Sequence, residues 1–341
     1  MSNNQILHHT PLFNVDGDDS EKSIIGGNTT GVFNLNNIKY SWAVDMKKIM
    51  LGNFWLPEKV PMESDKTEAP LPPAEEEALR KTLSFLIFLD SLQVNNLPNL
   101  AEYITAPEIK ALFTIQEFQE LIHTESYQYI QEGLYDSVTR EEIYYMWKDN
   151  PLLLKRNQLI ANFFEDFIEN QTVENFKRAI IANFVLEGIY FYSGFSFFHN
   201  LAYRQKRKNT DAIIRYIKQD ELTHVAMFAN IINSREVIDV VNNEDDRKMV
   251  VEIMQAAAEQ EIEWAKEIYG SKIEGITEQS SEGHIKALTN QRLALLGMEA
   301  MYPGFEESPY AYLEDTTKAN FFETTVTQYS RSETVSGWDD F

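Results

Sequence analysis

Two segments of the sequence place a glutamate three residues before a histidine, a spacing that presents both side chains on one face of a helix. Glu120 and His123 form the first pair, and Tyr127 follows one turn later, so all three fall within about 60° of helical arc. Glu221 and His224 form the second pair. Two such pairs on separate helices are what a carboxylate-bridged dinuclear metal site inside a helix bundle requires.

A site of this kind also needs one carboxylate from each of two further helices. Glu187 and Asp90 are candidates because each lies in a strongly apolar run, residues 184–191 and 85–90. A single Glu-x-x-His pair is common by chance, but solvent-exposed helix faces do not explain two pairs together with two such acids. Carboxylates in one pocket repel one another unless bound cations offset their charge. The pattern therefore predicts two buried metal ions.

The composition limits which metals, partners and cellular compartment are plausible. The sequence has no cysteine, so carboxylates and imidazoles must supply the ligands, which suits iron and manganese. Asp and Glu total 53 against 30 Lys and Arg, and the formal net charge of -23 argues against direct nucleic-acid binding. Residues 1–10 lack a signal-peptide pattern, and no uninterrupted apolar run reaches the roughly 18 residues of a membrane span. We expect a cytoplasmic protein without membrane association.

The elements that must position these ligands are helices, since no segment alternates convincingly as a strand. We predict an all-α fold, a ferritin-like helix bundle with a dinuclear metal site. Pro98 is expected to stop the second helix, and the proline- and acid-rich residues 61–73 are expected to form a surface connection. The predicted helices cover residues 41–51, 74–95, 108–133, 140–149, 152–169, 173–206, 209–232, 245–270 and 279–297.

The two ends of the chain lack this periodicity. Residues 1–40 are predicted to form an extended N-terminal arm, and residues 41–300 the helical domain. Residues 301–341 gain proline, serine and threonine and close with Gly337–Phe341, which indicates a flexible tail that docks on a partner.

The remaining histidines and one aromatic cluster are expected to have ordinary roles. His199 has no matching carboxylate three residues away and is expected to be a core or interface residue. His8, His9 and His284 are expected to be exposed to solvent. The phenylalanines of residues 191–198 are typical of core packing.

The order and spacing of these residues resemble the small, radical-generating subunit of class I ribonucleotide reductase, over roughly residues 10–341. The resemblance implies a homodimer that binds two metal ions, Fe/Fe or Mn/Mn, with a mixed Mn/Fe pair ranked below them. It also implies oxygen or superoxide as the activating oxidant. The implied metal ligands are Asp90, Glu120, His123, Glu187, Glu221 and His224.

The resemblance also implies roles for residues outside this set. Tyr127 is similar in position to the tyrosine that holds the stable radical in most of the family. Phe191, Phe195 and Ile217 resemble the apolar pocket that shields this radical.

A further set of residues resembles the family's route for an oxidising equivalent to the large catalytic subunit. Trp55, Asp220 and His123 match the inner part of this route, and Tyr329 in the tail matches the outer tyrosine. The last residues, which include Trp338 and Phe341, resemble the peptide that docks on the large subunit. A manganese form would imply a flavodoxin-like activase as a further partner.

The expected function is therefore that of the small subunit of ribonucleoside-diphosphate reductase, an oxidoreductase of deoxyribonucleotide biosynthesis that serves DNA replication. Two alternatives from the same superfamily remain open, a di-iron desaturase or monooxygenase and a metal-storage protein. The desaturase or monooxygenase gives no role to Asp90 as first ligand, to Trp55 or to Tyr329. The metal-storage protein leaves the long N-terminal arm and the aromatic tail unexplained. The residues leave open which metal is bound and whether Tyr127 or the metal pair stores the oxidising equivalent.

Overall fold

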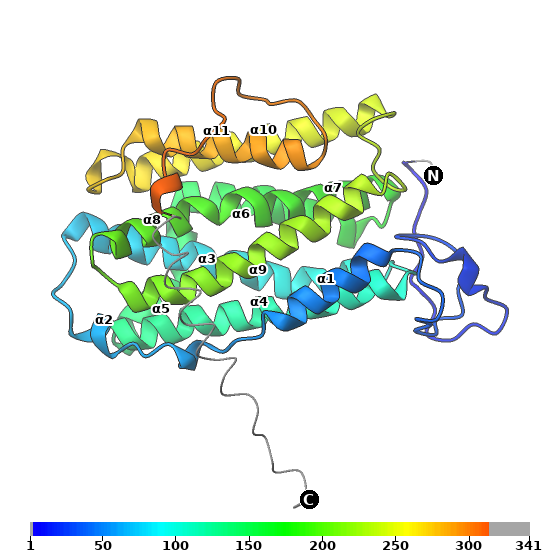
Figure 1. Ribbon diagram of the computed structural model, residues 1–341, viewed down its shortest axis with the longest axis horizontal. Coiled ribbons are helices and arrows are strands. Elements are labelled where there is room, and N and C mark those ends of the chain that lie inside the picture. The colour runs from blue at the N-terminus through cyan, green and yellow to red at the C-terminus, as the bar shows by residue number, and fades with distance from the viewer. Residues whose placement is uncertain (1–2, 314–341) are drawn as a thin grey trace, which may run out of the picture.

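The computed structural model describes residues 3–313, which fold into long helices that run largely side by side (Figure 1). Within these residues, β-pairing is limited to one isolated bridge between Ile6 and Thr172, so the predicted all-α fold is confirmed. The helices are α1 Ser41–Gly52, α2 Glu63–Thr67, α3 Pro73–Ala101, α4 Pro107–Leu134, α5 Ser137–Asp149, α6 Pro151–Glu169, α7 Val173–Val185, α8 Tyr192–Tyr203, α9 Lys208–Asn233, α10 Glu244–Ile268 and α11 Glu278–Leu295.

The ligand-bearing helices lie next to one another in this bundle. α3 packs along α4, and α9 packs against both α4 and α7. α10 and α11 pair along one edge of the molecule, and α1 and α4 lie toward the opposite edge (Figure 1). The predicted site therefore falls between helices that are far apart in the sequence.

The segment from Val173 to Tyr203 forms the centre of the core. It is long and apolar enough to cross a membrane, yet its most apolar window is completely buried inside the protein. We predicted one helix over residues 173–206, but a π-helical turn, Leu186–Tyr190, separates α7 from α8. Arg292 Nε donates a hydrogen bond to the carbonyl oxygen of Gly188, within this turn, at 3.0 Å.

Residues 61–73 are largely exposed, as expected for a surface connection, but they also contain the short helix α2, which was not predicted. Asp65 of α2 is buried, and its carboxylate accepts hydrogen bonds from the backbone N of Asn209 and of Thr210, at 3.1 and 2.7 Å. These nitrogens lie in the first turn of α9, whose backbone N–H groups have no partner within the helix. Asp65 therefore caps α9 from a distant part of the sequence.

The prediction that Pro98 stops the second helix is wrong, because α3 continues to Ala101. Pro98 lies in the last turn, so its missing N–H removes only one backbone hydrogen bond. Leu97 and Leu100 on this turn are completely buried. Their packing stabilises the turn despite the proline.

The N-terminal residues run over the bundle with little regular structure beyond the 3-10 turn Asp19–Glu21. Ile24 and Ile25 are buried, and the backbone N of Tyr40 donates to Glu108 Oε1 of α4 at 3.0 Å. The hydroxyl of Tyr40 donates to Glu236 Oε2 at 2.6 Å. Specific contacts therefore hold this segment to the bundle.

The prediction that His284 is exposed is wrong. Residues after α11 fold back over it, and Tyr310 and Leu313 in this stretch are buried. His284 Nδ1 lies 2.7 Å from Ser308 Oγ, and its Nε2 lies 3.2 Å from Ser196 Oγ. The packed part of the chain therefore extends at least to residue 313.

Candidate metal centre

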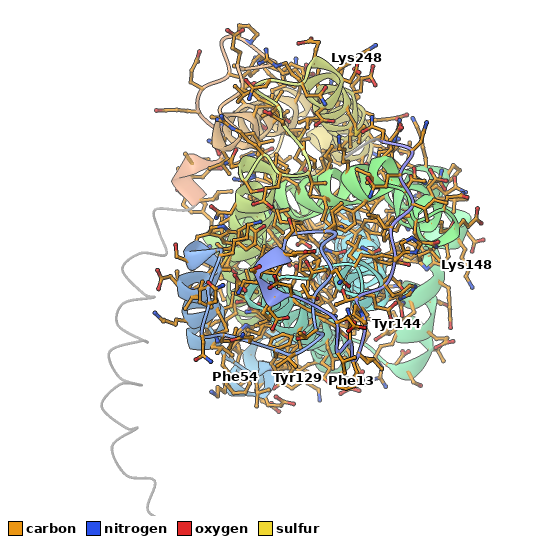
Figure 2. All side chains as sticks on the ribbon, turned by 90° about the vertical axis from the view of Figure 1, so that its right-hand side faces the viewer. Phe13, Phe54, Tyr129, Tyr144, Lys148 and Lys248 are labelled. Carbon is orange, nitrogen blue, oxygen red and sulfur yellow. The ribbon has the colours of Figure 1, made fainter. Side chains whose placement is uncertain are left out.

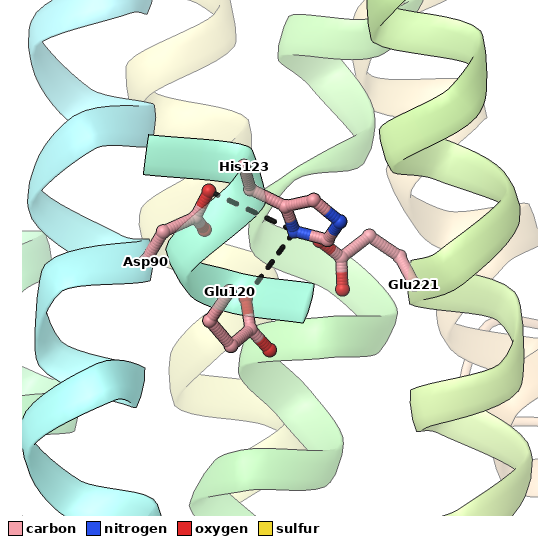
Figure 3. A group of neighbouring side chains, drawn as sticks. All are labelled: Asp90, Glu120, His123 and Glu221. Atoms are coloured by element: carbon pink, nitrogen blue, oxygen red, sulfur yellow. Dashed lines mark ion pairs between the residues drawn. The ribbon is translucent and has the colours of Figure 1, made fainter. Parts of the chain in front are cut away.

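Four helical segments bring the six predicted ligands together in the interior, and all six side chains are fully buried. Figure 3 shows four of them pointing into one space between α3, α4 and α9. α3 supplies Asp90, α4 supplies Glu120 and His123, the π-helical turn supplies Glu187, and α9 supplies Glu221 and His224.

The ligand atoms form two overlapping groups, and within each group they lie within 4.8 Å of one another. Glu120 and Glu221 belong to both groups. Asp90 and His123 complete the first group, while Glu187 and His224 complete the second. Each group could hold a metal ion, and two such positions would share two carboxylates.

Both imidazoles turn the same ring nitrogen toward the carboxylates. His123 Nδ1 lies 3.3 Å from Glu120 Oε2 and 3.2 Å from Glu221 Oε1. His224 Nδ1 lies 2.9 Å from Glu221 Oε2, 3.3 Å from Glu120 Oε1 and 3.5 Å from Glu187 Oε2. The Nδ1 atoms therefore face the centre and the Nε2 atoms face away from it.

Several inward-facing atoms lack a hydrogen-bond partner among the residues that the structure describes. Buried polar atoms without partners are costly and rare, and here they converge on one space. Bound cations would satisfy them, so these residues fit a dinuclear site with oxygen and nitrogen donors. The atoms are both carboxylate oxygens of Asp90, Glu120 Oε2, Glu187 Oε2, Glu221 Oε1 and His123 Nδ1.

The cluster contains four carboxylates and only two imidazoles to offset their negative charge. Burial raises the pKa of Asp90 and of Glu187, and the neighbouring Glu120 raises both further. Burial alone would lower the pKa of His123, but its contacts with the Asp220 and Glu120 carboxylates raise it well above its ordinary value. Without cations the cluster therefore favours bound protons, and cations would replace them.

Two glutamines that hold the site were missed from the sequence. Gln116 Nε2 donates to Glu120 Oε1 at 3.0 Å and to Glu187 Oε1 at 2.9 Å, and Gln93 Nε2 also donates to Glu187 Oε1. Each is a buried polar residue about one helical turn from a predicted ligand on the same helix. That spacing is the signal that could have identified them.

The structure places two predicted residues of the transfer route directly against a ligand. Trp55 Nε1 donates to Asp220 Oδ2 at 2.8 Å, and His123 Nε2 lies 3.2 Å from the same oxygen. The ring of Trp55 stacks on that of His123 with centroids 6.2 Å apart. Phe54, which precedes Trp55, is exposed at the edge of the molecule in Figure 2. Trp55 therefore lies between the site and an outer face.

Tyr127 is completely buried and lies on the same helix as Glu120 and His123. Burial raises the pKa of its phenol well above the ordinary value, and the negative charge of Asp90 raises it further. Its hydroxyl makes no hydrogen bond of standard geometry within residues 3–313, although it interacts with the Asp90 carboxylate. The phenol is therefore protonated and shielded from water.

Some of the other predicted residues lie in the core, and others lie outside the described residues. Phe191, Phe195 and Ile217 are completely buried, and the two phenylalanine rings stack with centroids 5.8 Å apart. His199 is buried, as expected, with Nδ1 2.5 Å from Asp211 Oδ1. The predicted tail residues Tyr329, Trp338 and Phe341 lie outside the described residues.

Comparison with known proteins distinguishes between the reductase and its two alternatives. The family model for the ribonucleotide reductase small chain matches residues 32–309. The chain is 38% identical to the ribonucleoside-diphosphate reductase subunit beta of Treponema pallidum, over 98% of this chain and 99% of that protein. It is 35% identical to the protein of the same name from Halalkalibacterium halodurans, with the same coverage.

Solved structures agree with this result. The ribonucleotide reductase R2 subunit from Clostridium botulinum matches with a TM-score of 0.87 and 40% identity, over 91% of this chain and 99% of that chain. The dimanganese(II)-NrdF of Streptococcus sanguinis shares the fold with a TM-score of 0.71 at 22% identity, over 82% of this chain and 97% of that chain. These matches and the buried carboxylate and histidine cluster support one conclusion. The chain belongs to the ribonucleotide reductase small-chain family, as the radical-generating beta subunit of a ribonucleoside-diphosphate reductase.

Proposed function

We propose that six residues of this subunit hold two metal ions, with Glu120 and Glu221 bridging them. The observation that carries the proposal is the pair of overlapping ligand groups, which share these two carboxylates. In this assignment Asp90 and His123 complete one metal position, and Glu187 and His224 complete the other. When bound, a pair of iron or manganese ions supplies the oxidising power, drawn from oxygen or superoxide, for radical formation.

Tyr127 is the residue that we propose to store the oxidising equivalent in an iron form. Its phenol loses one electron and one proton, and the Asp90 carboxylate, which interacts with the hydroxyl, is the proposed acceptor for that proton. In this proposal Phe191, Phe195 and Ile217, all completely buried, exclude water and reductants from the radical. In a manganese form the metal pair itself can hold the equivalent, and Tyr127 then stays reduced.

Trp55 and Asp220 are the proposed inner part of the route to the large subunit. Trp55 gives up an electron toward the oxidised Tyr127 while the proton on its Nε1 passes along the hydrogen bond to Asp220 Oδ2, whose donor and acceptor atoms are 2.8 Å apart. Because the proton has an acceptor in place, the step creates no unpaired buried charge. Tyr329 in the tail is the proposed next carrier, between Trp55 and the large subunit.

The proposed partners follow from the family and from the charge of the chain. The subunit forms a homodimer, and its C-terminal tail docks on the large catalytic subunit. A manganese form would also use a flavodoxin-like activase, and a mixed Mn/Fe pair ranks below Fe/Fe and Mn/Mn. The net charge of -23 argues against direct nucleic-acid binding. The proposed location is the cytoplasm, without membrane association.

Reconstitution with a purified large subunit tests the proposed roles. Deoxynucleotide formation should depend on this chain, and both Tyr329→Phe and a chain that ends at residue 313 should abolish it. Metal content should stay unchanged in both variants, because neither change touches the described ligands. Turnover that survives Tyr329→Phe would remove the tail tyrosine from the route.

Electron paramagnetic resonance of separately loaded iron and manganese forms tests the storage site. We expect a tyrosyl signal from the active iron form and its complete loss in Tyr127→Phe. An active manganese form whose signal survives Tyr127→Phe would assign storage to the metal pair.

A further inference from the structure

Gln119, the residue before Glu120 on α4, lies between the second ligand histidine and the transfer route. Its Oε1 is 3.1 Å from His224 Nε2, and its Nε2 donates to Asp220 Oδ1 at 3.0 Å. The same Nε2 faces the backbone oxygen of Met50 at 3.5 Å. The side chain is buried, so these contacts account for its polar atoms without solvent.

The neighbours of Gln119 determine how its amide is oriented. The Asp220 carboxylate and the Met50 carbonyl only accept hydrogen bonds, so the amino group of the amide must face them. The carbonyl oxygen then faces His224, and His224 Nε2 must carry the hydrogen of that bond. This leaves His224 Nδ1, which faces the carboxylates, free to bind metal.

The two carboxylate oxygens of Asp220 have different partners. The amide occupies Oδ1, while Trp55 Nε1 and His123 Nε2 both lie against Oδ2, at 2.8 and 3.2 Å. His123 therefore reaches Asp220 directly, whereas His224 reaches it only through Gln119. One amide joins the second half of the site to the residue that holds Trp55.

We infer that Gln119 is a positioning residue that fixes the imidazole of His224 and the carboxylate of Asp220 together. This inference rests on the ligand set proposed above. Hydrogen-bond partners behind a ligand typically change metal affinity by about ten- to hundredfold when they are removed. Since His123 keeps its own bond to Asp220, removal of the Gln119 amide should lower the metal affinity of one position and not of both.

Gln119→Leu in the full-length chain tests the inference, with Mn(II) alone as the probe. Leucine is preferred to alanine because a hollow of about 40 Å³ already borders Gln119, Trp55 and Asp220. A smaller side chain would let water enter and replace the amide. Gln119→Met removes the same hydrogen bonds with a flexible side chain, and it replaces the leucine variant if that variant does not fold.

The loss of the free Mn(II) signal in electron paramagnetic resonance measures how many ions bind and how tightly. The unaltered chain should bind two ions, and Gln119→Leu should weaken one of them by about ten- to hundredfold and leave the other unchanged. Gln128→Leu on the same helix is the matched control, because Gln128 is exposed and bonds only to Glu132 among the described residues. The control should bind both ions as the unaltered chain does.

A second measurement reports on the hydrogen bond itself. In protein labelled with ¹⁵N-histidine and loaded with Zn(II), the Nε2 hydrogens of His123 and His224 should exchange slowly with water. Gln119→Leu should accelerate the exchange of one of them only.

The outcomes separate this inference from the ligand assignment. Fewer than two bound Mn(II) ions in the unaltered chain would overturn the ligand set and the inference with it. Two tightly bound ions in both chains, or equal weakening of both sites with faster exchange at both histidines, would overturn the positioning role alone.

Discussion

At the scale of single residues, the six proposed ligands are not equivalent, because some belong to both proposed metal positions and others to only one. Glu221 belongs to both ligand groups, whereas Asp90 belongs to one. We therefore predict that Glu221→Ala abolishes binding of both Mn(II) ions, while Asp90→Ala leaves one ion bound. Metal analysis after gel filtration measures the stoichiometry. Equal losses in the two variants would mean that the carboxylates are not shared as proposed.

Two buried tyrosines should differ in how much stability they lose when the hydroxyl is removed. Tyr127→Phe removes a hydroxyl without a well-formed hydrogen bond, so the unfolding free energy of the metal-free protein should change by less than about 1 kcal/mol. Tyr40→Phe removes a 2.6 Å hydrogen bond to the Glu236 carboxylate and should cost about 1.5 to 3 kcal/mol. Urea denaturation of both variants checks the contrast. A larger loss in Tyr127→Phe would mean that its hydroxyl has a partner.

The meeting of six carboxylate and imidazole side chains in one buried cluster could be predicted, because their spacing on a helix constrains which side chains meet. Gln119 could not be predicted, because an amide next to a ligand in the sequence has no chemical signature until its partners are known. His284 was predicted wrongly because residues that follow α11 cover it, and that packing is not visible in local sequence.

At the scale of elements, α9 depends on a cap that α2 provides. Asp65 accepts hydrogen bonds from the backbone N of Asn209 and Thr210, and from the hydroxyl of Thr210 at 2.7 Å. We predict that Asp65→Ala lowers the unfolding free energy by about 1 to 2 kcal/mol, the usual cost of losing a helix cap. Because α9 carries Glu221 and His224, metal affinity should fall as well.

Asp45→Ala is the matched control for this prediction. Asp45 is exposed and pairs with Lys48 at 2.8 Å on the surface of α1. An exposed pair of this kind contributes at most about 1 kcal/mol. Thermal unfolding of both variants measures the difference, and equal effects would show that Asp65 does not act as a cap.

The contact between α10 and α11 should depend on pH. Glu282 of α11 lies 2.5 Å from both Lys266 of α10 and Lys286, and these lysines lower its pKa from 4.5 to about 2. Because the folded pKa lies below the unfolded one, the stabilisation is full above 4.5 and is lost as the pH falls toward 2. Glu282→Gln should therefore destabilise the protein by at most about 1 kcal/mol at neutral pH, since solvent screens the pair.

Urea denaturation at low salt, from neutral pH down to about pH 3, measures this dependence. The difference between Glu282→Gln and the unaltered chain should shrink as the pH falls. Glu252→Gln on α10 is the control, because Glu252 is exposed and its pair with Lys248 is 3.7 Å long. A difference that stays constant with pH would contradict the assigned pKa.

The sequence predicted the long helices well, because their apolar positions recur with the helical period. It failed where tertiary packing outweighs local preference. Pro98 was expected to end α3, yet buried leucines carry the helix one turn further. The π-helical turn that carries Glu187 was not predicted, because its altered pitch depends on contacts such as that from Arg292.

At the scale of the whole molecule, metal should stabilise the entire bundle. The site joins α3, α4, the π-helical turn and α9, and its carboxylates lack compensating charge without cations. A ligand that binds only the folded state stabilises it by about 2.7 kcal/mol at a concentration of 100 Kd. We predict that excess Mn(II) raises the Tm by several degrees over chelator-treated protein, as differential scanning calorimetry can measure. An unchanged Tm with two bound ions would contradict this coupling.

The complete burial of all six ligands has a consequence for how the protein comes to contain a particular metal. An ion can leave only when the surrounding helices separate, and such openings of a packed core are rare. Exchange is therefore governed by how often the bundle opens, and not by which ion binds more strongly. A molecule keeps the metal that was available when it was loaded. The chemistry of each molecule then depends on the supply of iron and manganese in the cell when it was loaded.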